Sequence, residues 1–164
     1  MKDKTLIIIS SGHHWPIKIR GKIFIKSNKE KVWQVLTDYD HLTEFVPNLV
    51  ESIHSLDGDG NYIVQQKLAV NVPIFKRIIK QEILVKEEKY PEILTYKATR
   101  GDMEIFEGDW LLEENEGNKE ETLLTYNCNI KPIFYAPLWI FKVIYKNEVI
   151  ATLNAIRDRS LKAS

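Results

Sequence analysis

Apolar and polar residues alternate along residues 17–26 of the chain. Isoleucine occupies positions 17, 19, 23 and 25, and lysine or arginine occupies positions 18, 20, 22 and 26. A period of two residues predicts a strand with one buried and one exposed face. The alternation ends at Ser27, and Glu30 follows three residues later, just before an apolar run. This spacing is that of a capping box, so we predict a helix that starts at Ser27 and buries Val32, Trp33 and Leu36.

A second short helix is predicted directly after the first. Asp38 or Asp40 can cap it, and it should end at residues 45–47, because the residue before a proline avoids the helical conformation. Beyond Pro47, turn signals separate six runs rich in β-branched and aromatic residues; the signals lie at residues 57–60, 71–73, 89–91, 100–102 and 117–118. Short turns can join only antiparallel neighbours, so these runs predict an antiparallel meander.

The pattern returns to a helical period from about Pro137 to about Leu161. Apolar residues recur there every three or four positions, as at Phe141, Ile144 and Tyr145, which predicts a long amphipathic helix. Its large partner must be the sheet. We therefore predict an α+β fold in which a curved antiparallel sheet of about seven strands wraps around a long C-terminal helix, with two short helices after the first strand. Residues 1–15 are predicted to form an N-terminal extension, and residues 16–164 a single domain.

Four stretches of the chain resemble the START-like, or SRPBCC, helix-grip superfamily. They are VWQVLTDYDHLTEFVPNLVES (residues 32–52), EGDWLLEE (107–114), ETLLTY (121–126) and AIRDRS (155–160). Within the superfamily, the chain is similar to the polyketide cyclase/dehydrase-type group that includes coenzyme Q-binding and ribosome-association-toxin relatives. The resemblance implies a helix-grip fold with a hydrophobic ligand between sheet and long helix. It implies no universal catalytic residue.

Composition narrows the class of function. The 23 basic and 23 acidic residues balance to a formal net charge of zero, which argues against a DNA-binding protein. One cysteine, Cys128, and no Cys-x-x-Cys pattern indicate a reducing compartment. The apolar run at residues 5–9 is too short for a signal peptide, and no run reaches the roughly 18 residues of a membrane span. We therefore expect a cytoplasmic protein.

The predicted ligand cavity follows from which strand residues share a parity. Inward-facing positions would bring polar groups onto an otherwise apolar wall, as small-molecule sites usually have. A glycine at 108, in the parity of Phe106 and Trp110, would either open cavity space or mark a bulge. The residues predicted to contact the ligand are Gln66, Gln81, Tyr96, Arg100, Phe106, Trp110, Tyr126, Phe134, Tyr135 and Phe141.

The candidates for catalysis or metal binding are weaker. Cys128 would need a base, and nothing in the sequence places His41 or His54 nearby, so we interpret this cysteine as a small buried residue. The pair His13-His14 lacks a third ligand, so we expect no metal and no cofactor.

Three functions remain open from the sequence. The first is binding or carrying a hydrophobic small molecule, such as a lipid, an isoprenoid quinone or a polyketide-like aromatic. The second is a cyclase or dehydratase acting on a similar ligand, with Tyr96, Arg100 and Tyr126 as its polar groups. The third is a ribosome-associated binding module.

The segment before the long helix is predicted to close the cavity. Residues 130–136 should cross its open end, so that Phe134 and Tyr135 form a lid with Trp139 near its edge. Three basic residues, Lys76, Arg77 and Lys142, lie near these aromatic groups and Phe75 in the sequence. The same region is therefore a candidate contact with a membrane or a second subunit.

Overall fold

The structure is a computed structural model that describes residues 6–9, 13–72 and 75–162, with side chains for residues 13–71 and 76–162. Phe75 falls outside the described side chains. The elements of this part of the chain are, in order, β1 (Leu6–Ile9), β2 (Ile17–Ile25), α1 (Lys29–Leu36), the 3₁₀ helix η1 (Tyr39–Glu44), β3 (Leu49–Leu56), β4 (Tyr62–Val72), β5 (Phe75–Lys89), β6 (Ile93–Gly101), β7 (Met103–Asn115), β8 (Asn118–Pro132) and α2 (Leu138–Lys162).

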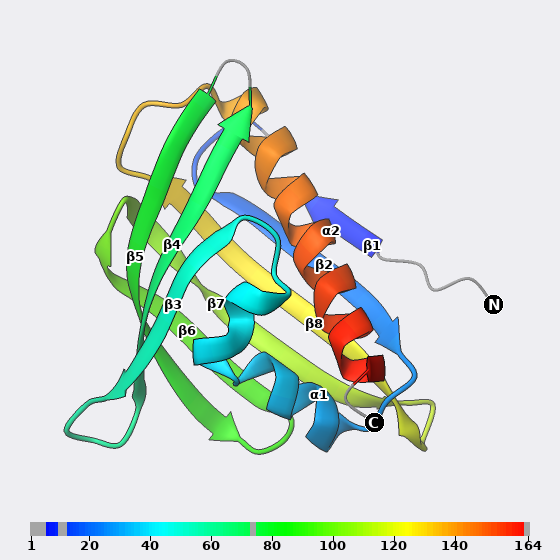
Figure 1. Cartoon of the computed structure of the whole chain (residues 1–164). Helices are drawn as coiled ribbons and strands as arrows, with labels where there is room; N and C mark the ends of the chain where they lie inside the picture. The colour runs from blue at the N-terminus through cyan, green and yellow to red at the C-terminus, as the bar shows by residue number, and fades with distance from the viewer. Residues whose placement is uncertain (1–5, 10–12, 73–74, 163–164) are drawn as a thin grey trace.

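All strands belong to one antiparallel sheet, which curves around α2 (Figure 1). The spatial order is β1-β2-β8-β7-β6-β5-β4-β3, so five short turns join β3 to β8 as a meander. The two short helices carry the chain from β2 to β3 at the far edge of the sheet (Figure 1). The predicted helix-grip fold is confirmed. β1 was not predicted from the sequence; it pairs with β2 and makes an eighth strand.

The start of α1 differs by one residue from the prediction. Asn28, not Ser27, is the N-cap, and its side-chain oxygen accepts a 2.9 Å hydrogen bond from the backbone N–H of Lys31. Asparagine caps a helix as well as serine does. Ser27 has another contact, because its carbonyl oxygen accepts a 2.7 Å bond from the Thr122 hydroxyl. The predicted burial of Val32, Trp33 and Leu36 is confirmed.

The long helix does not cover the whole concave face. α2 packs on β1 and β2, and its buried residues Leu153 and Ile156 meet the isoleucines of β2 in the core. The sheet curves so that β3, β4 and β5 stand to one side of α2 (Figure 1). Residues of α2 and of β4, β5 and β6 line a cavity between the helix and these strands. Among the described residues, no helix is long and apolar enough to cross a membrane.

Candidate functional site: a cavity between the sheet and α2

A cavity of about 220 Å³ lies between the sheet, the short helices and α2. Aliphatic and aromatic side chains form most of its wall, including Leu36 and Leu42 from the short helices, Val64 and Leu68 from β4, Ile79, Ile83 and Val85 from β5, and Ile144, Val149 and Ile156 from α2.

The structure brings together seven of the ten side chains predicted to contact a ligand. Those that line the cavity are Gln66, Gln81, Tyr96, Phe106, Trp110, Tyr126 and Phe141. Arg100, Phe134 and Tyr135 are not among the lining residues. Contact of the seven with a ligand stays a prediction.

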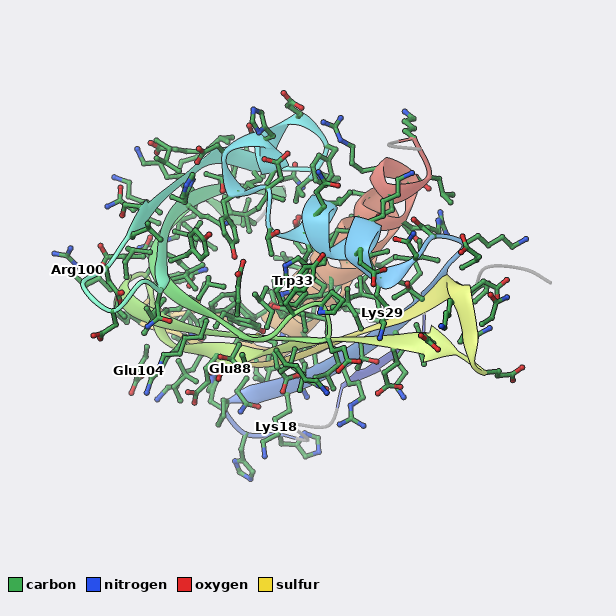
Figure 2. The ribbon with its side chains drawn as sticks, turned by 90° about the horizontal axis from the view of Figure 1, so that it is seen from below. Lys18, Lys29, Trp33, Glu88, Arg100 and Glu104 are labelled. Atoms are coloured by element: carbon green, nitrogen blue, oxygen red, sulfur yellow. The ribbon has the colours of Figure 1, made fainter. Side chains whose placement is uncertain are left out.

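Arg100 lies outside because of a β-bulge. Ile83 pairs with Ala98, but the residue before it in β5, Glu82, pairs with Arg100, so Thr99 is an extra residue. One extra residue reverses the parity of everything beyond it. The Arg100 side chain is 79% exposed and forms a salt bridge of 3.1 Å with Glu82, and Figure 2 shows it at the outer edge of the molecule. Arg100, which was predicted to contact the ligand, therefore lies outside the cavity.

The segment before α2 does not place its aromatic rings in the cavity. Tyr135 is 89% exposed. Phe134 packs at the margin of the core, with the guanidinium carbon of Arg77 4.1 Å from the centre of its ring. The predicted lid therefore does not rest on Phe134 or Tyr135. Trp139, expected near the edge of the lid, is 69% exposed.

Gly108 is needed for close packing rather than for cavity space. It pairs with Tyr96 and Cys128 without a register shift, so no bulge occurs there. A Cβ atom at this position would lie 1.9 Å from the carbonyl oxygen of Asn127 and 2.7 Å from the Tyr96 hydroxyl. Neither of the two expectations for Gly108 was right: the missing side chain admits a hydrogen bond between its neighbours.

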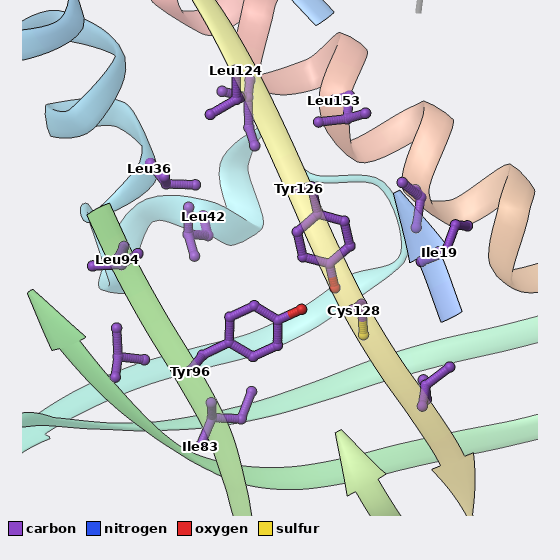
Figure 3. Packing of buried hydrophobic residues seen from close by; sticks show 14 of the residues in the cluster. Ile19, Leu36, Leu42, Ile83, Leu94, Tyr96, Leu124, Tyr126, Cys128 and Leu153 are labelled. Carbon is purple, nitrogen blue, oxygen red and sulfur yellow. The ribbon is translucent and has the colours of Figure 1, made fainter. Parts of the chain in front are cut away.

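Tyr126, Tyr145 and Cys128 form a hydrogen-bonded group beside the cavity, and the Tyr96 ring stacks on that of Tyr126. The hydroxyls of Tyr126 and Tyr145 are 2.8 Å apart, and the Tyr145 hydroxyl donates to Cys128 Sγ at 3.3 Å. The Tyr96 and Tyr126 side chains point toward the same sulfur (Figure 3). Burial raises the pKa of each of these tyrosines and of the Cys128 thiol, so all four stay protonated at neutral pH.

This group does not have the arrangement that the enzyme hypothesis requires. The Tyr96 hydroxyl is already bonded to Asn127, the Tyr126 hydroxyl to Tyr145, and Arg100 lies outside. A general acid works best with a pKa near the operating pH. Burial raises the pKa of these tyrosines further above neutral pH. Cys128 is buried, and its interpretation as a small buried residue is confirmed.

The two histidines considered as bases have other partners. His41 Nδ1 lies 2.7 Å from Asp38, and His54 Nδ1 lies 2.8 Å from Asp40, both at exposed positions. The hydrogen bond to Asp38 raises the pKa of His41. In the part of the chain that the structure describes, no three histidine, cysteine or acidic residues come together as a metal site would require.

The cavity also contains polar groups that the sequence analysis missed. Tyr39, from η1, and Glu148, from α2, both line it. The Tyr39 hydroxyl and the Gln81 Oε1 atom are buried and have no hydrogen-bond partner among the described residues. Burial raises the pKa of Tyr39, so its hydroxyl remains a donor. Buried polar groups are normally paired, so two such atoms in one cavity wall require an explanation.

Glu148 connects the long helix to the segment between η1 and β3. Its Oε1 atom accepts a 2.8 Å hydrogen bond from the Asn48 side chain, and burial raises its pKa. Asn48 has a φ of 65°, a left-handed conformation that asparagine tolerates better than most residues. A second link follows nearby, where Arg159 donates to Glu44 at 2.8 Å. Val46 and Leu49, which flank Asn48 in this segment, line the cavity.

Residues 27–153 match the family described as polyketide cyclase / dehydrase and lipid transport. The chain belongs to this family. No curated protein sequence matches the chain. The family match confirms that the chain belongs to the START-like superfamily, as its sequence suggested.

Several solved structures are similar to this member of the polyketide cyclase / dehydrase and lipid transport family over most of its length. A STAR-related lipid transfer protein from Xanthomonas axonopodis is 17% identical, with a TM-score of 0.75, and the match covers 98% of this chain and 96% of that one. The Zhui aromatase/cyclase from Streptomyces is 12% identical, with a TM-score of 0.71 and coverage of 88% and 93%. A START superfamily protein from Mycobacterium smegmatis is 12% identical, with a TM-score of 0.73 and coverage of 90% and 99%. At these identities the likeness concerns the fold.

Proposed function

We propose that this protein binds or carries a hydrophobic small molecule in the cavity between the sheet and α2, in a reducing, cytoplasmic environment. The observation that carries the proposal is the cavity itself, about 220 Å³ with a mostly apolar wall. Protein interiors are normally packed with few voids larger than a water molecule. A void of this size forfeits packing energy, and a ligand that fills it would recover that energy.

The wall chemistry supports binding rather than catalysis. The tyrosine hydroxyls at one end bond to one another or to backbone, and the described residues supply no charged acid–base pair inside the cavity. The names of the similar proteins point in the same direction, since one is a lipid transfer protein. The aromatase/cyclase among them is the reason to consider an enzyme, but no pair of catalytic groups favours that alternative here.

Filling the cavity by substitution tests the proposal. Val64 of β4 lines the cavity and is 1% exposed. In Val64→Phe the added ring has the void available, so we expect the domain to fold while uptake of naphthalene falls at least tenfold. Ile63→Phe, on the opposite face of the same strand, is the matched control and should bind as the parent does. Native mass spectrometry of the purified parent would show directly whether a small molecule is retained.

Two results would contradict the proposal. If the parent takes up no apolar probe, or if Val64→Phe binds as well as the parent while remaining folded by circular dichroism, the cavity is not a binding site.

We also propose that the start of α2 contacts an anionic membrane surface, from which an apolar ligand would be collected. Four large apolar side chains are exposed there: Ile133, Tyr135, Trp139 and Val143, with exposed fractions of 67%, 89%, 69% and 56%. Lys146 follows Trp139 and Val143 at helical spacing on the same face and is exposed. Aromatic groups beside lysine are typical of surfaces that lie in the membrane interface.

Co-sedimentation with vesicles tests this contact. Vesicles of phosphatidylcholine with phosphatidylserine should retain the parent, and Trp139→Ala should reduce retention severalfold. Leu56→Ala removes a similarly exposed apolar side chain, 63% exposed, at the end of β3 far from the start of α2 (Figure 1), and should have no effect. Equal retention of Trp139→Ala and the parent would remove the membrane contact without affecting the cavity proposal.

A further inference from the structure

A row of three polar side chains runs across neighbouring strands of the sheet, and two of them, Gln66 and Gln81, line the cavity. Ser52, Gln66 and Gln81 occupy paired positions on the adjacent strands β3, β4 and β5. The neighbouring pairs on the same face are apolar, with Val64 opposite Ile83 on one side and Leu68 opposite Ile79 on the other. The polar row is therefore confined to one line across the wall.

The hydrogen bonds within this row leave one acceptor over. Gln66 Nε2 donates to Ser52 Oγ at 3.3 Å, whereas Gln81 Oε1 is buried without a partner among the described residues. On its other side Gln81 pairs with Gly101, which has no side chain to offer a donor. A buried amide oxygen without a donor destabilises a fold, and a leucine in its place would not. A donor group on a molecule that occupies the cavity would satisfy this oxygen.

The terminal amide can present this oxygen to the cavity with little rearrangement. The last torsion of a glutamine side chain is broad and soft, and Gln81 lines the cavity. An amide oxygen accepts a bond from an O–H group. A hydroxyl on an otherwise apolar ligand matches both the oxygen and the surrounding wall.

The size of the cavity limits what can carry that hydroxyl. An apolar protein cavity of about 150 Å³ is known to hold a benzene molecule, and this one measures about 220 Å³. It has room for roughly one or two fused rings, whereas the long chain of a prenylated quinone or a diacyl lipid would extend outside it.

We propose that Gln81 selects ring-sized apolar ligands that bear a hydroxyl group, by accepting a hydrogen bond from that group at its amide oxygen. The inference rests on the proposed ligand-binding function and specifies the class of ligand.

The test compares three probes of nearly equal size: naphthol, which can donate a hydrogen bond, methoxynaphthalene, which cannot, and naphthalene, which has no polar group. Isothermal titration of the parent should give roughly tenfold tighter binding of naphthol than of methoxynaphthalene, the effect of one hydrogen bond in an apolar site. Gln81→Leu should bind all three with similar affinity. Gln81→Met, which keeps the length of the side chain, is the second variant in case the first does not fold.

Gln65→Leu is the matched control, because Gln65 is the chain neighbour of Gln66 on the exposed face and pairs with Glu82 rather than with Gln81. This variant should keep the preference for naphthol. If the parent binds naphthol and methoxynaphthalene equally, or if both Gln81 variants keep the preference, the role of Gln81 is refuted while the cavity proposal stands. If none of the three probes binds the parent, the proposed function itself is refuted.

Discussion

The Tyr96 hydroxyl donates a 2.7 Å hydrogen bond to the backbone carbonyl oxygen of Asn127, two strands away. The bond occupies the space where a side chain would stand on Gly108 of the intervening strand β7. One aromatic side chain of the cavity wall is thus positioned by the absence of another side chain.

Gly108→Ala should therefore destabilise the fold. The new methyl group would overlap the Asn127 carbonyl, which belongs to the backbone and cannot turn aside. Overpacking of this kind costs about 3 kcal/mol, which lowers Tm by roughly 6–12 °C in a domain of this size. Gly58→Ala is the control, because a Cβ there meets nothing within 4 Å, and its Tm should stay near that of the parent. Equal Tm values for the two variants would contradict the packing seen at Gly108.

Two tyrosine-to-phenylalanine changes should affect stability differently. Tyr39→Phe removes a buried hydroxyl without a partner among the described residues, so the free energy of unfolding should stay equal or rise by up to about 1 kcal/mol. Tyr145→Phe removes the bonds to Tyr126 and Cys128 and should cost about 1–2 kcal/mol. Urea unfolding followed by tryptophan fluorescence measures both. A loss in Tyr39→Phe as large as that in Tyr145→Phe would show that Tyr39 has an unrecognised partner.

The thiol of Cys128 should be unreactive in the folded protein. Its burial raises the pKa, and only the thiolate attacks an alkylating reagent. Iodoacetamide at pH 8 should modify the native chain at least a hundredfold more slowly than the chain unfolded in urea, as followed by mass spectrometry. Rapid modification of the native protein would instead mean that the cavity opens readily beside the tyrosines.

The ion pairs of Glu92 with Lys89 and Lys29 should make the stability of the fold depend on pH in the acidic range. Lys89 and Lys29 lower the pKa of Glu92 from its ordinary 4.5 to about 2. Because the folded pKa is the lower one, the stabilisation is present above pH 4.5 and is lost as the pH falls toward 2. Glu92→Gln lacks this contribution, so the difference in Tm between parent and variant should shrink over that interval. Glu120→Gln, at an exposed position of the β7–β8 hairpin, is the control; a constant difference for Glu92→Gln would exclude the ion pair as its cause.

The fold was predictable because its signals are local and repeated. Alternation along β2 and β8 identifies a buried face, as the burial of Ile17 and Leu124 shows, and short turns leave only antiparallel neighbours. The same alternation located Gln66 and Gln81 correctly, because β4 and β5 pair without interruption between these residues.

The predicted positions of site residues were wrong where the regular alternation of a strand or helix is interrupted. The bulge at Thr99 moved Arg100 to the outer face, and a bulge has no signal in this stretch of sequence. Tyr135 stands on a loop, where no period applies. Tyr39 lies between two aspartates on a short 3₁₀ helix, so its burial depends on tertiary contacts alone. Glu148 could have been found, since it follows Ile144 by four residues on the face of α2 that lines the cavity.

The pairing of β2 with β8 has a consequence for how the protein is made. Ile17 lies opposite Ile130, so more than a hundred residues must leave the ribosome before the strand finds its partner. Contacts this distant along a chain slow folding, and β2 waits during synthesis with one edge unpaired. α2 comes later still, and it completes the wall of the cavity. A nascent chain therefore cannot enclose a ligand until α2 has been synthesised.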